Sequence, residues 1–335
     1  MGKYRWAIIL VSVLAIIVIG LGSFYLYATK VEERSVQSIL VEYYCKITGI
    51  KEKTFIDKAK VTELIENKRI ENAKPYKFPG DLKLKSEITM ETSNEMEVFF
   101  LNRNEETHKK QILYLHGGAY VMQPANGHWN FLDELARNAN ATVIVPIYPK
   151  APNHQYKEAF DKVLPIYRNL IAEIDSKNIT IMGDSAGGGF ALALSQLLLE
   201  KGLPQPGNII LLSPWLDITM KNPDIPALEE KDPMLGAYGL VQMGKAWAGD
   251  SDPSSYLLSP INGEIKGLGK ISLFVGTHEL FLPDARKFKD MAAAQGVMIN
   301  YFEYPKMNHV FPLFPIPEAN KARNQIFNIV NEIAP

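Results

Sequence analysis

The chain has 335 residues, of which 47% are hydrophobic and 10% aromatic, so it can bury a large core and has the composition of a globular protein. Its 36 Lys and Arg residues nearly balance its 37 Asp and Glu residues, and no basic stripe with interleaved aromatics occurs, which argues against nucleic acid as a partner. The single cysteine, Cys45, excludes a disulfide framework within the chain and has no neighbours that indicate a zinc site, so we expect it to be a small buried hydrophobic residue.

The first expected element is an uncharged apolar segment from Trp6 to Thr29. As a helix it would cover roughly 30 to 36 Å, which spans the hydrocarbon core of a bilayer. We therefore predict a membrane anchor over residues 1–30, with a transmembrane helix at about residues 6–28. Lys3 and Arg5 precede this helix and a segment of mixed charge follows it, so the positive-inside rule places the N-terminus in the cytoplasm and the rest of the chain outside.

A cleaved secretory signal is the alternative for the same segment. The apolar run is longer than the roughly 7 to 15 residues that such signals use, and its end lacks a small-x-small cleavage site. The sequence therefore favours a single-pass membrane protein, with secretion after cleavage as the second possibility.

Residues 31–80 are expected to be helical and rich in polar residues. Apolar side chains recur there at helical spacing at Val36, Ile39, Leu40, Tyr43, Tyr44 and Ile47. Gly49 is a suitable helix stop, and two prolines and a glycine mark a boundary near residue 80. We expect this segment to form a helical cover over the part of the chain that follows, with a plain linker as the alternative.

From residue 81 to residue 335, short strands alternate with helices. Strands are predicted at 84–92 and 95–103 as a hairpin, then at 111–118, 141–149, 178–185, 208–215, 271–277 and 299–305. Helices are predicted at 128–140, 155–174, 190–202, 284–296 and 317–333. Apolar strands in alternation with helices predict an α/β fold with a mostly parallel central sheet flanked by helices, and such sheets carry their sites at the carboxyl ends of the strands. Residues 219–256 interrupt the alternation and are expected to form a cap.

A serine lies between glycines at the end of one predicted strand. Residues 183–187 read Gly-Asp-Ser-Ala-Gly and match G-x-S-x-G, a sharp turn from strand to helix that leaves Ser185 exposed. The glycines are needed because side chains there would clash with neighbouring backbone. A helix that begins near Ala186 brings its positive end close to the Ser185 hydroxyl.

Upstream of this serine, the sequence His-Gly-Gly-Ala follows another predicted strand at residues 116–119. Small residues let backbone N–H groups point into a cavity, where those of Gly117, Gly118 or Ala119 could hold a developing oxyanion together with the N–H of Ala186. A tight turn with no further role is the alternative for this loop.

A histidine and an acid complete the candidate site. His309 follows the last predicted strand and could act as general base for Ser185, whereas His108, His116, His128, His154 and His278 are interpreted mostly as surface or turn residues. Glu279 directly follows a predicted strand and is the preferred partner of the imidazole. Asp284 is the alternative acid, interpreted otherwise as a residue that satisfies the backbone N–H groups at the start of a helix.

The order serine, acid, histidine is that of the α/β-hydrolase fold. The motifs HGGAY, GDSAGGG, LSPWLD, YLLSP and MNHVF occur in order over residues 111–335 and resemble the hormone-sensitive-lipase-like branch of that superfamily, which hydrolyses carboxylic esters. The resemblance implies a nucleophile at Ser185, a base at His309 and an acid at Glu279. It departs in two places, because the family commonly has a third glycine at Ala119 and an aspartate at Glu279, so the choice between Glu279 and Asp284 stays open.

We therefore expect a serine carboxylesterase or lipase that forms an acyl-enzyme, acts on a small-molecule or lipid ester, and needs no metal or organic cofactor. A non-catalytic binding protein on a hydrolase scaffold is the alternative, as is an acyltransferase or peptidase with the same residues. Four large side chains are candidates for an acyl site or for simple core, namely Trp215, Met234, Tyr238 and Trp247. Acyl chain length and oligomeric state do not follow from the sequence.

Overall fold

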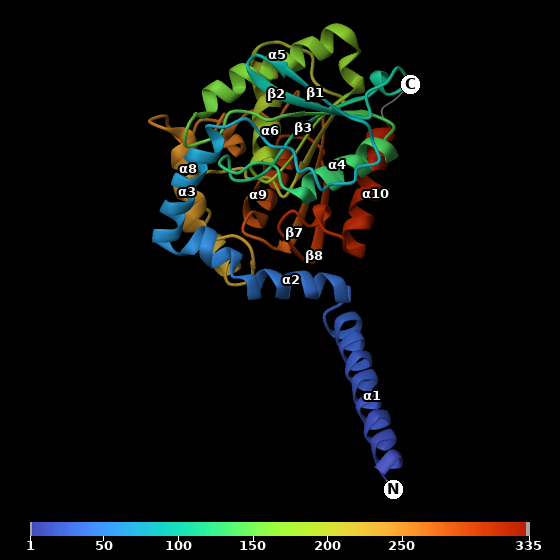
Figure 1. Cartoon of the computed structure of the whole chain (residues 1–335). Helices are drawn as coiled ribbons and strands as arrows, with labels where there is room; N and C mark the ends of the chain where they lie inside the picture. Colours follow the sequence, from blue (N-terminus) through green and yellow to red (C-terminus); the bar gives the residue numbers. More distant parts are fainter. Residues whose placement is uncertain (1, 333–335) are drawn as a thin grey trace.

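The computed structural model describes residues 2–332, and its centre is one eight-stranded sheet with strands in the order β1-β2-β4-β3-β5-β6-β7-β8 (Figure 1). The strands are β1 (Ile88–Ser93), β2 (Met96–Leu101), β3 (Gln111–Leu115), β4 (Thr142–Pro146), β5 (Ile179–Asp184), β6 (Asn208–Leu212), β7 (Lys270–His278) and β8 (Asn300–Asn308). The pairs β1–β2 and β2–β4 are antiparallel and all other pairs are parallel. This confirms the predicted α/β-hydrolase architecture.

Helices cover both faces of the sheet because its central strands are apolar on both sides. The longer helices of the body are α4 (Asn126–Asn138), α5 (Tyr156–Glu173), α6 (Ala186–Glu200), α9 (Leu282–Ala294) and α10 (Pro317–Asn331). Side chains of α4 and α10 share one core with alternate strand residues, and those of α5, α6 and α9 share a second core with the remaining strand residues. This period of two is expected of strands buried on both faces.

The N-terminal helix α1 (Gly2–Leu26) projects from the body (Figure 1). Its segment Tyr4–Val31 is, among the described residues, the one helix long and apolar enough to cross a membrane, and none of its most apolar window is buried. By length and composition alone the segment also fits a signal sequence. A π-helical turn at Tyr27–Val31 joins it to the rest of the chain.

Helix α2 (Val36–Thr48) lies across the end of the body from which α1 projects (Figure 1). It ends at Gly49 as predicted, and this glycine has the left-handed φ of 63° that closes a helix. Ile39 is buried against the body, whereas Leu40, Tyr43, Tyr44 and Ile47 are exposed.

Residues 219–256, called the cap segment because they are expected to form a cap, contain α7 (Ile225–Glu229) and α8 (Ala237–Ala248). A π-helical turn at Glu52–Ile56 and helix α3 (Lys58–Asn72) pack against α8, and a Cβ at Gly239 would lie 2.5 Å from the Cα of Phe55. Lys51 Nζ donates to the backbone oxygen of Asp232 at 2.9 Å. The N-terminal segment therefore covers the cap through residues 51–72 rather than through α2.

Candidate active site

Ser185 lies in the turn between β5 and α6, with φ 54° and ψ −123°. This conformation is strained for a residue with a Cβ and is held because the Ser185 N–H donates to the carbonyl of Leu212 at 2.8 Å. The turn requires glycine on both sides: a Cβ at Gly183 would lie 2.2 Å from the Gly187 oxygen, and a Cβ at Gly187 would lie 2.0 Å from the Leu115 oxygen. The sequence pattern thus reflects close backbone approach around the serine.

The structure brings Ser185, His309 and Glu279 together. His309 Nε2 lies 2.9 Å from Ser185 Oγ, and His309 Nδ1 lies 2.7 Å from Glu279 Oε2. His309 follows β8 and Glu279 follows β7, so both come from the carboxyl ends of neighbouring parallel strands. The three residues are 7%, 4% and 0% exposed, respectively. A hydroxyl, an imidazole and a carboxylate in this order can activate the hydroxyl as a nucleophile.

Ser213 is a member of this cluster that the sequence did not single out. It follows β6, and its hydroxyl donates to Glu279 Oε1 at 2.9 Å while accepting from the Val310 N–H at 3.0 Å. The Gly276 N–H donates to the same Oε1 at 2.5 Å. These bonds hold the carboxylate and the backbone next to His309 in one orientation. The position of Ser213 at the end of a central strand is the signal that could have found it.

Asp284 does not contact His309. It lies in the first turn of α9, where its Oδ1 accepts from the side-chain amide of Asn222 at 2.8 Å and its Oδ2 has no hydrogen-bond partner among the described residues. The interpretation that Asp284 satisfies the N–H groups of its own helix is therefore wrong, because its partner comes from the cap segment. Burial raises the pKa of Asp284 to about 6.

The loop after β3 lies against the strand-to-helix turn, and one of its N–H groups is already used. The Gly117 N–H donates to Asp184 Oδ1 at 2.9 Å, so this donor is not free for an oxyanion. Gly118 and Ala119 have φ angles of 119° and 51°, in the positive range that favours glycine. Their N–H groups and that of Ala186 donate to no acceptor within the described chain. An oxyanion role remains a prediction, and of the four residues named for it, Gly118, Ala119 and Ala186 have N–H groups with no acceptor there.

Asp184, the variable residue of the G-x-S-x-G motif, holds this loop in place. Besides the Gly117 N–H, its carboxylate accepts from the Tyr114 hydroxyl at 2.6 Å and lies 3.2 Å from His128 Nε2. Although burial opposes the shift, Asp184 raises the pKa of His128. The interpretation of His128 as a surface or turn residue is wrong, because its half-buried ring connects α4 to the Asp184 carboxylate of the serine loop.

His116, at the start of the same loop, is also buried rather than a surface residue. Its Nδ1 lies 2.7 Å from the Gly117 oxygen, and its ring stacks on Tyr148 with 4.5 Å between centroids. Burial holds the pKa of His116 well below its usual range, and the charge of Lys150 lowers it further. The neutral imidazole of His116 therefore supports the loop through its contacts with the Gly117 oxygen and the Tyr148 ring.

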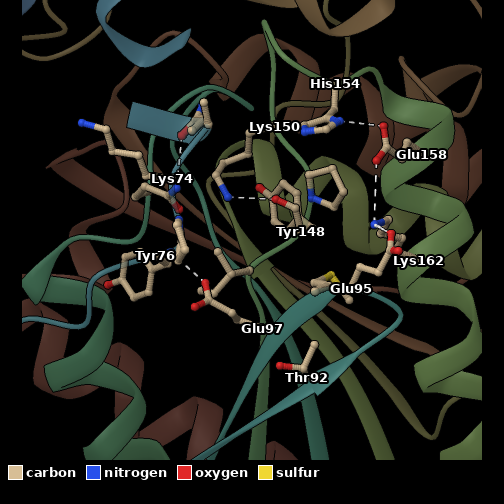
Figure 2. A pocket seen from close by; sticks show the side chains of 17 residues that line it. Lys74, Tyr76, Thr92, Glu95, Glu97, Tyr148, Lys150, His154, Glu158 and Lys162 are labelled. Atoms are coloured by element: carbon tan, nitrogen blue, oxygen red, sulfur yellow. Dashed lines mark hydrogen bonds and ion pairs between the residues drawn. The ribbon is translucent and has the colours of Figure 1, made fainter. Parts of the chain in front are cut away.

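A hollow of about 580 Å³ lies beside Tyr148 (Figure 2). Lys150 lines it, is 3% exposed, and donates from Nζ to the Tyr148 backbone oxygen at 2.8 Å. Figure 2 shows the Lys150 amine turned toward Tyr148, with Glu97 across the hollow. Burial lowers the pKa of Lys150 to about 7. The buried amine thus fixes the backbone of Tyr148, on whose ring His116 stacks.

Aromatic side chains surround the serine loop on the cap side. The backbone N–H of Trp215 donates to the backbone carbonyl of Ser185 at 2.9 Å, and the rings of Trp215 and Trp247 both stack on Tyr120. These three side chains are fully buried, whereas Met234 and Tyr238 are partly exposed. Tyr120 therefore links Trp215, next to the serine loop, to Trp247 of α8. Contact with an acyl group remains a prediction for all four residues named from the sequence.

Metal-ligating clusters were sought among the described side chains. No group of three or more His, Cys, Asp or Glu side chains is gathered there as a set of metal ligands. Cys45 is buried in α2 as expected and forms no disulfide. The polar groups at Ser185 are the hydroxyl, imidazole, carboxylate and backbone N–H groups described above.

Comparisons with known proteins agree with this geometry. Residues 112–313, more than half of the chain, match a family model described as alpha/beta hydrolase fold. The crystal structure of an esterase from the bacterial hormone-sensitive lipase family is 26% identical, with a TM-score of 0.71 and coverage of 81% of this chain and 97% of that one. The chain is a hormone-sensitive-lipase-like α/β-hydrolase.

Other relatives of this hydrolase lead to the same conclusion. A Staphylococcus aureus protein with a known crystal structure is 36% identical in sequence to this chain. Its TM-score is 0.79, and the match covers 82% of this chain and 93% of that one. An esterase of Acinetobacter venetianus is 33% identical over 215 residues, which are 63% of this chain and 71% of the esterase. The hydrolase is accordingly an ester-hydrolysing enzyme.

Proposed function

We propose that the hydrolase is a membrane-anchored serine carboxylesterase or lipase that forms an acyl-enzyme on Ser185. The observation that carries the proposal is the continuous hydrogen-bonded series from Ser185 Oγ through His309 to Glu279, at 2.9 and 2.7 Å. It lies beside three N–H groups without acceptors in the described chain, at Gly118, Ala119 and Ala186.

The first half of the reaction transfers an acyl group to the serine. His309 Nε2 takes the Ser185 proton as Oγ attacks the ester carbonyl, and Glu279 holds the proton on Nδ1 of the resulting imidazolium. The free N–H groups of the loop and of Ala186 stabilise the tetrahedral oxyanion. His309 then gives its proton to the departing alcohol, which leaves the acyl-enzyme.

The second half repeats the sequence with water. His309 takes a proton from water, the hydroxide attacks the acyl carbonyl, and Ser185 leaves with the returned proton. An acyltransferase would use another alcohol at this step, and a peptidase would release an amine in the first half. A non-catalytic binding protein has no need of an aligned serine, histidine and carboxylate, so the geometry favours hydrolysis of a small-molecule or lipid ester.

We assign residues 1–30 to the membrane anchor, 31–80 to a helical cover, and 81–335 to the catalytic domain with a cap at 219–256. The exposed apolar surface of α1 supports a single-pass anchor, and the charges around it support a cytoplasmic N-terminus and an extracytoplasmic catalytic domain. The alternative is a secreted enzyme, and it would be recognised as soluble protein in the medium, shortened by the apolar segment.

The test of the proposal is hydrolysis of p-nitrophenyl acetate, butyrate and longer esters by the full chain in mild detergent, beside Ser185→Ala. We expect the variant to lose at least a thousandfold in kcat, because the nucleophile is gone while the loop geometry stays. Equal rates for the two proteins would refute the acyl-enzyme on Ser185 and favour the binding-protein alternative.

A further inference from the structure

Helix α2 carries an apolar stripe on the side that faces away from the body. We call this surface the outer stripe; it consists of Leu40, Tyr43, Tyr44 and Ile47. Tyr44 is 69% and Ile47 is 82% exposed. Residues spaced by three and four positions share one helix face, so the stripe is continuous along the helix. A contiguous apolar surface of this kind marks an interaction site.

The charges of α2 do not interrupt this stripe. The helix contains two charged residues, Glu42 and Lys46, which form an ion pair at 2.5 Å. Glu42 is buried toward the body, where it also contacts Arg34 at 2.5 Å. The outward face of α2 therefore presents no exposed carboxylate, and its two tyrosines are residues that favour the boundary between lipid and water.

The junction between α1 and α2 is fixed to the catalytic domain. Glu32 pairs with Lys306 of β8 at 3.2 Å, and the Ser35 N–H and hydroxyl donate to Glu318 of α10 at 2.6 and 2.8 Å. Arg34 donates to the Lys306 oxygen at 3.2 Å. These contacts set the direction in which α1 leaves the body and the plane in which α2 lies.

The position of α2 identifies its partner. It begins five residues after the apolar segment ends at Val31, on the end of the body from which α1 projects (Figure 1). If α1 crosses a bilayer, a connection this short keeps α2 within roughly 17 Å of the point where the chain leaves the lipid. Amphipathic helices with apolar and aromatic side chains on one face lie in that interfacial region.

We propose that the outer stripe of α2 is embedded in the bilayer interface and forms a second membrane contact beside α1. This inference rests on the proposed membrane anchor and not on the proposed ester chemistry. The ligand is the lipid surface itself, met by Leu40 and Ile47 at acyl-chain depth and by Tyr43 and Tyr44 at the headgroups. The contact holds the catalytic body in one orientation on the membrane.

The test measures the depth of single labels in the full chain. In a Cys45→Ala background, Ile47→Cys carries an NBD fluorophore, and the matched control carries it at Asp161→Cys on α5, at the far end of the body (Figure 1). Both proteins are reconstituted into phosphatidylcholine vesicles with and without lipid bearing a doxyl group at acyl carbon 5. Flotation with vesicles tests the anchor, and an unchanged thermal midpoint shows that each labelled protein is folded. A Tyr43→Cys label repeats the measurement should the Ile47 variant not fold.

We expect doxyl lipid to quench the label on α2 at least threefold more strongly than the label at Asp161. Equal, weak quenching in protein that floats with vesicles would overturn the proposal while leaving the anchor in place. A label on α2 that is shielded from water but not quenched by doxyl lipid, and that becomes exposed to water when the protein is diluted, would assign the stripe to a second copy of the chain. That result would also overturn the proposal. Protein that does not float would refute the anchor and this inference together, while ester hydrolysis by the same sample tests the proposed chemistry separately.

Discussion

The exchange of one buried carboxylate for an amide, Glu279→Gln, tests the assignment of the acid. During acyl transfer His309 becomes positively charged beside Glu279, whose Oε2 lies 2.7 Å from Nδ1. Two unit charges with centres about 4 Å apart attract by about 4 kcal/mol at an effective dielectric constant of 20. The amide removes this attraction, so we expect kcat to fall about a thousandfold, since each 1.4 kcal/mol is a factor of ten.

Asp284→Asn is the matched control. Asp284 is as buried as Glu279 and undergoes the same change from carboxylate to amide, but its side chain contacts Asn222 of the cap segment instead of His309. We expect this variant to keep kcat within threefold of the parent.

The assay is steady-state hydrolysis of p-nitrophenyl butyrate from pH 6 to 9, with kcat and KM separated and folding checked by circular dichroism. Loss of activity in Asp284→Asn with activity retained in Glu279→Gln would refute the reasoning and exchange the two roles.

Three further changes probe the surroundings of the site. Ser213→Ala removes the hydroxyl that orients the Glu279 carboxylate, and kcat should fall about tenfold at unchanged KM; a changed KM alone would contradict a positioning role. Because burial lowers the pKa of Lys150 from 10.5 to about 7, the folded chain binds fewer protons than the unfolded chain between these values and loses stability as pH falls through them. Lys150→Met should therefore have a higher free energy of unfolding than the parent in urea titrations, and this difference should be about 3 kcal/mol larger at pH 6 than at pH 9.5. A difference that does not depend on pH would count against a buried amine. Ala119→Gly should leave kcat within twofold and stability within about 1 kcal/mol, because φ is 51° there and only the backbone N–H acts; a large loss of activity would give the methyl group a role.

Much of the fold and the central residues of the site could be predicted because they depend on local sequence. The glycines around Ser185 are required by backbone contacts within one turn, and this makes the motif visible. Glu279 and His309 follow strands that are adjacent in the sheet, so a correct order of strands and helices places both near Ser185.

The parts that could not be predicted depend on contacts between distant residues or on which face of a helix is buried. His128 meets Asp184 across 56 positions, and Ser213 meets Glu279 across 66, with no periodic signal for either contact. Whether the Gly117 N–H is free depends on the Asp184 side chain. In α2, apolar residues occupy a wide arc, and helical spacing alone does not say which part of the arc meets the body.

The central claim is that Ser185 is acylated, and covalent labelling tests it most directly. The full chain in mild detergent is treated with diethyl p-nitrophenyl phosphate, which transfers a diethylphosphoryl group to an activated serine and releases p-nitrophenolate. Peptide mass spectrometry of the parent, Ser185→Ala and His309→Ala then locates the adduct. We predict one phosphoryl group per chain on the peptide that contains Ser185, none on Ser185→Ala, and labelling at least a hundredfold slower in His309→Ala. Stoichiometric labelling at another residue, or none in protein that still hydrolyses esters, would contradict the account.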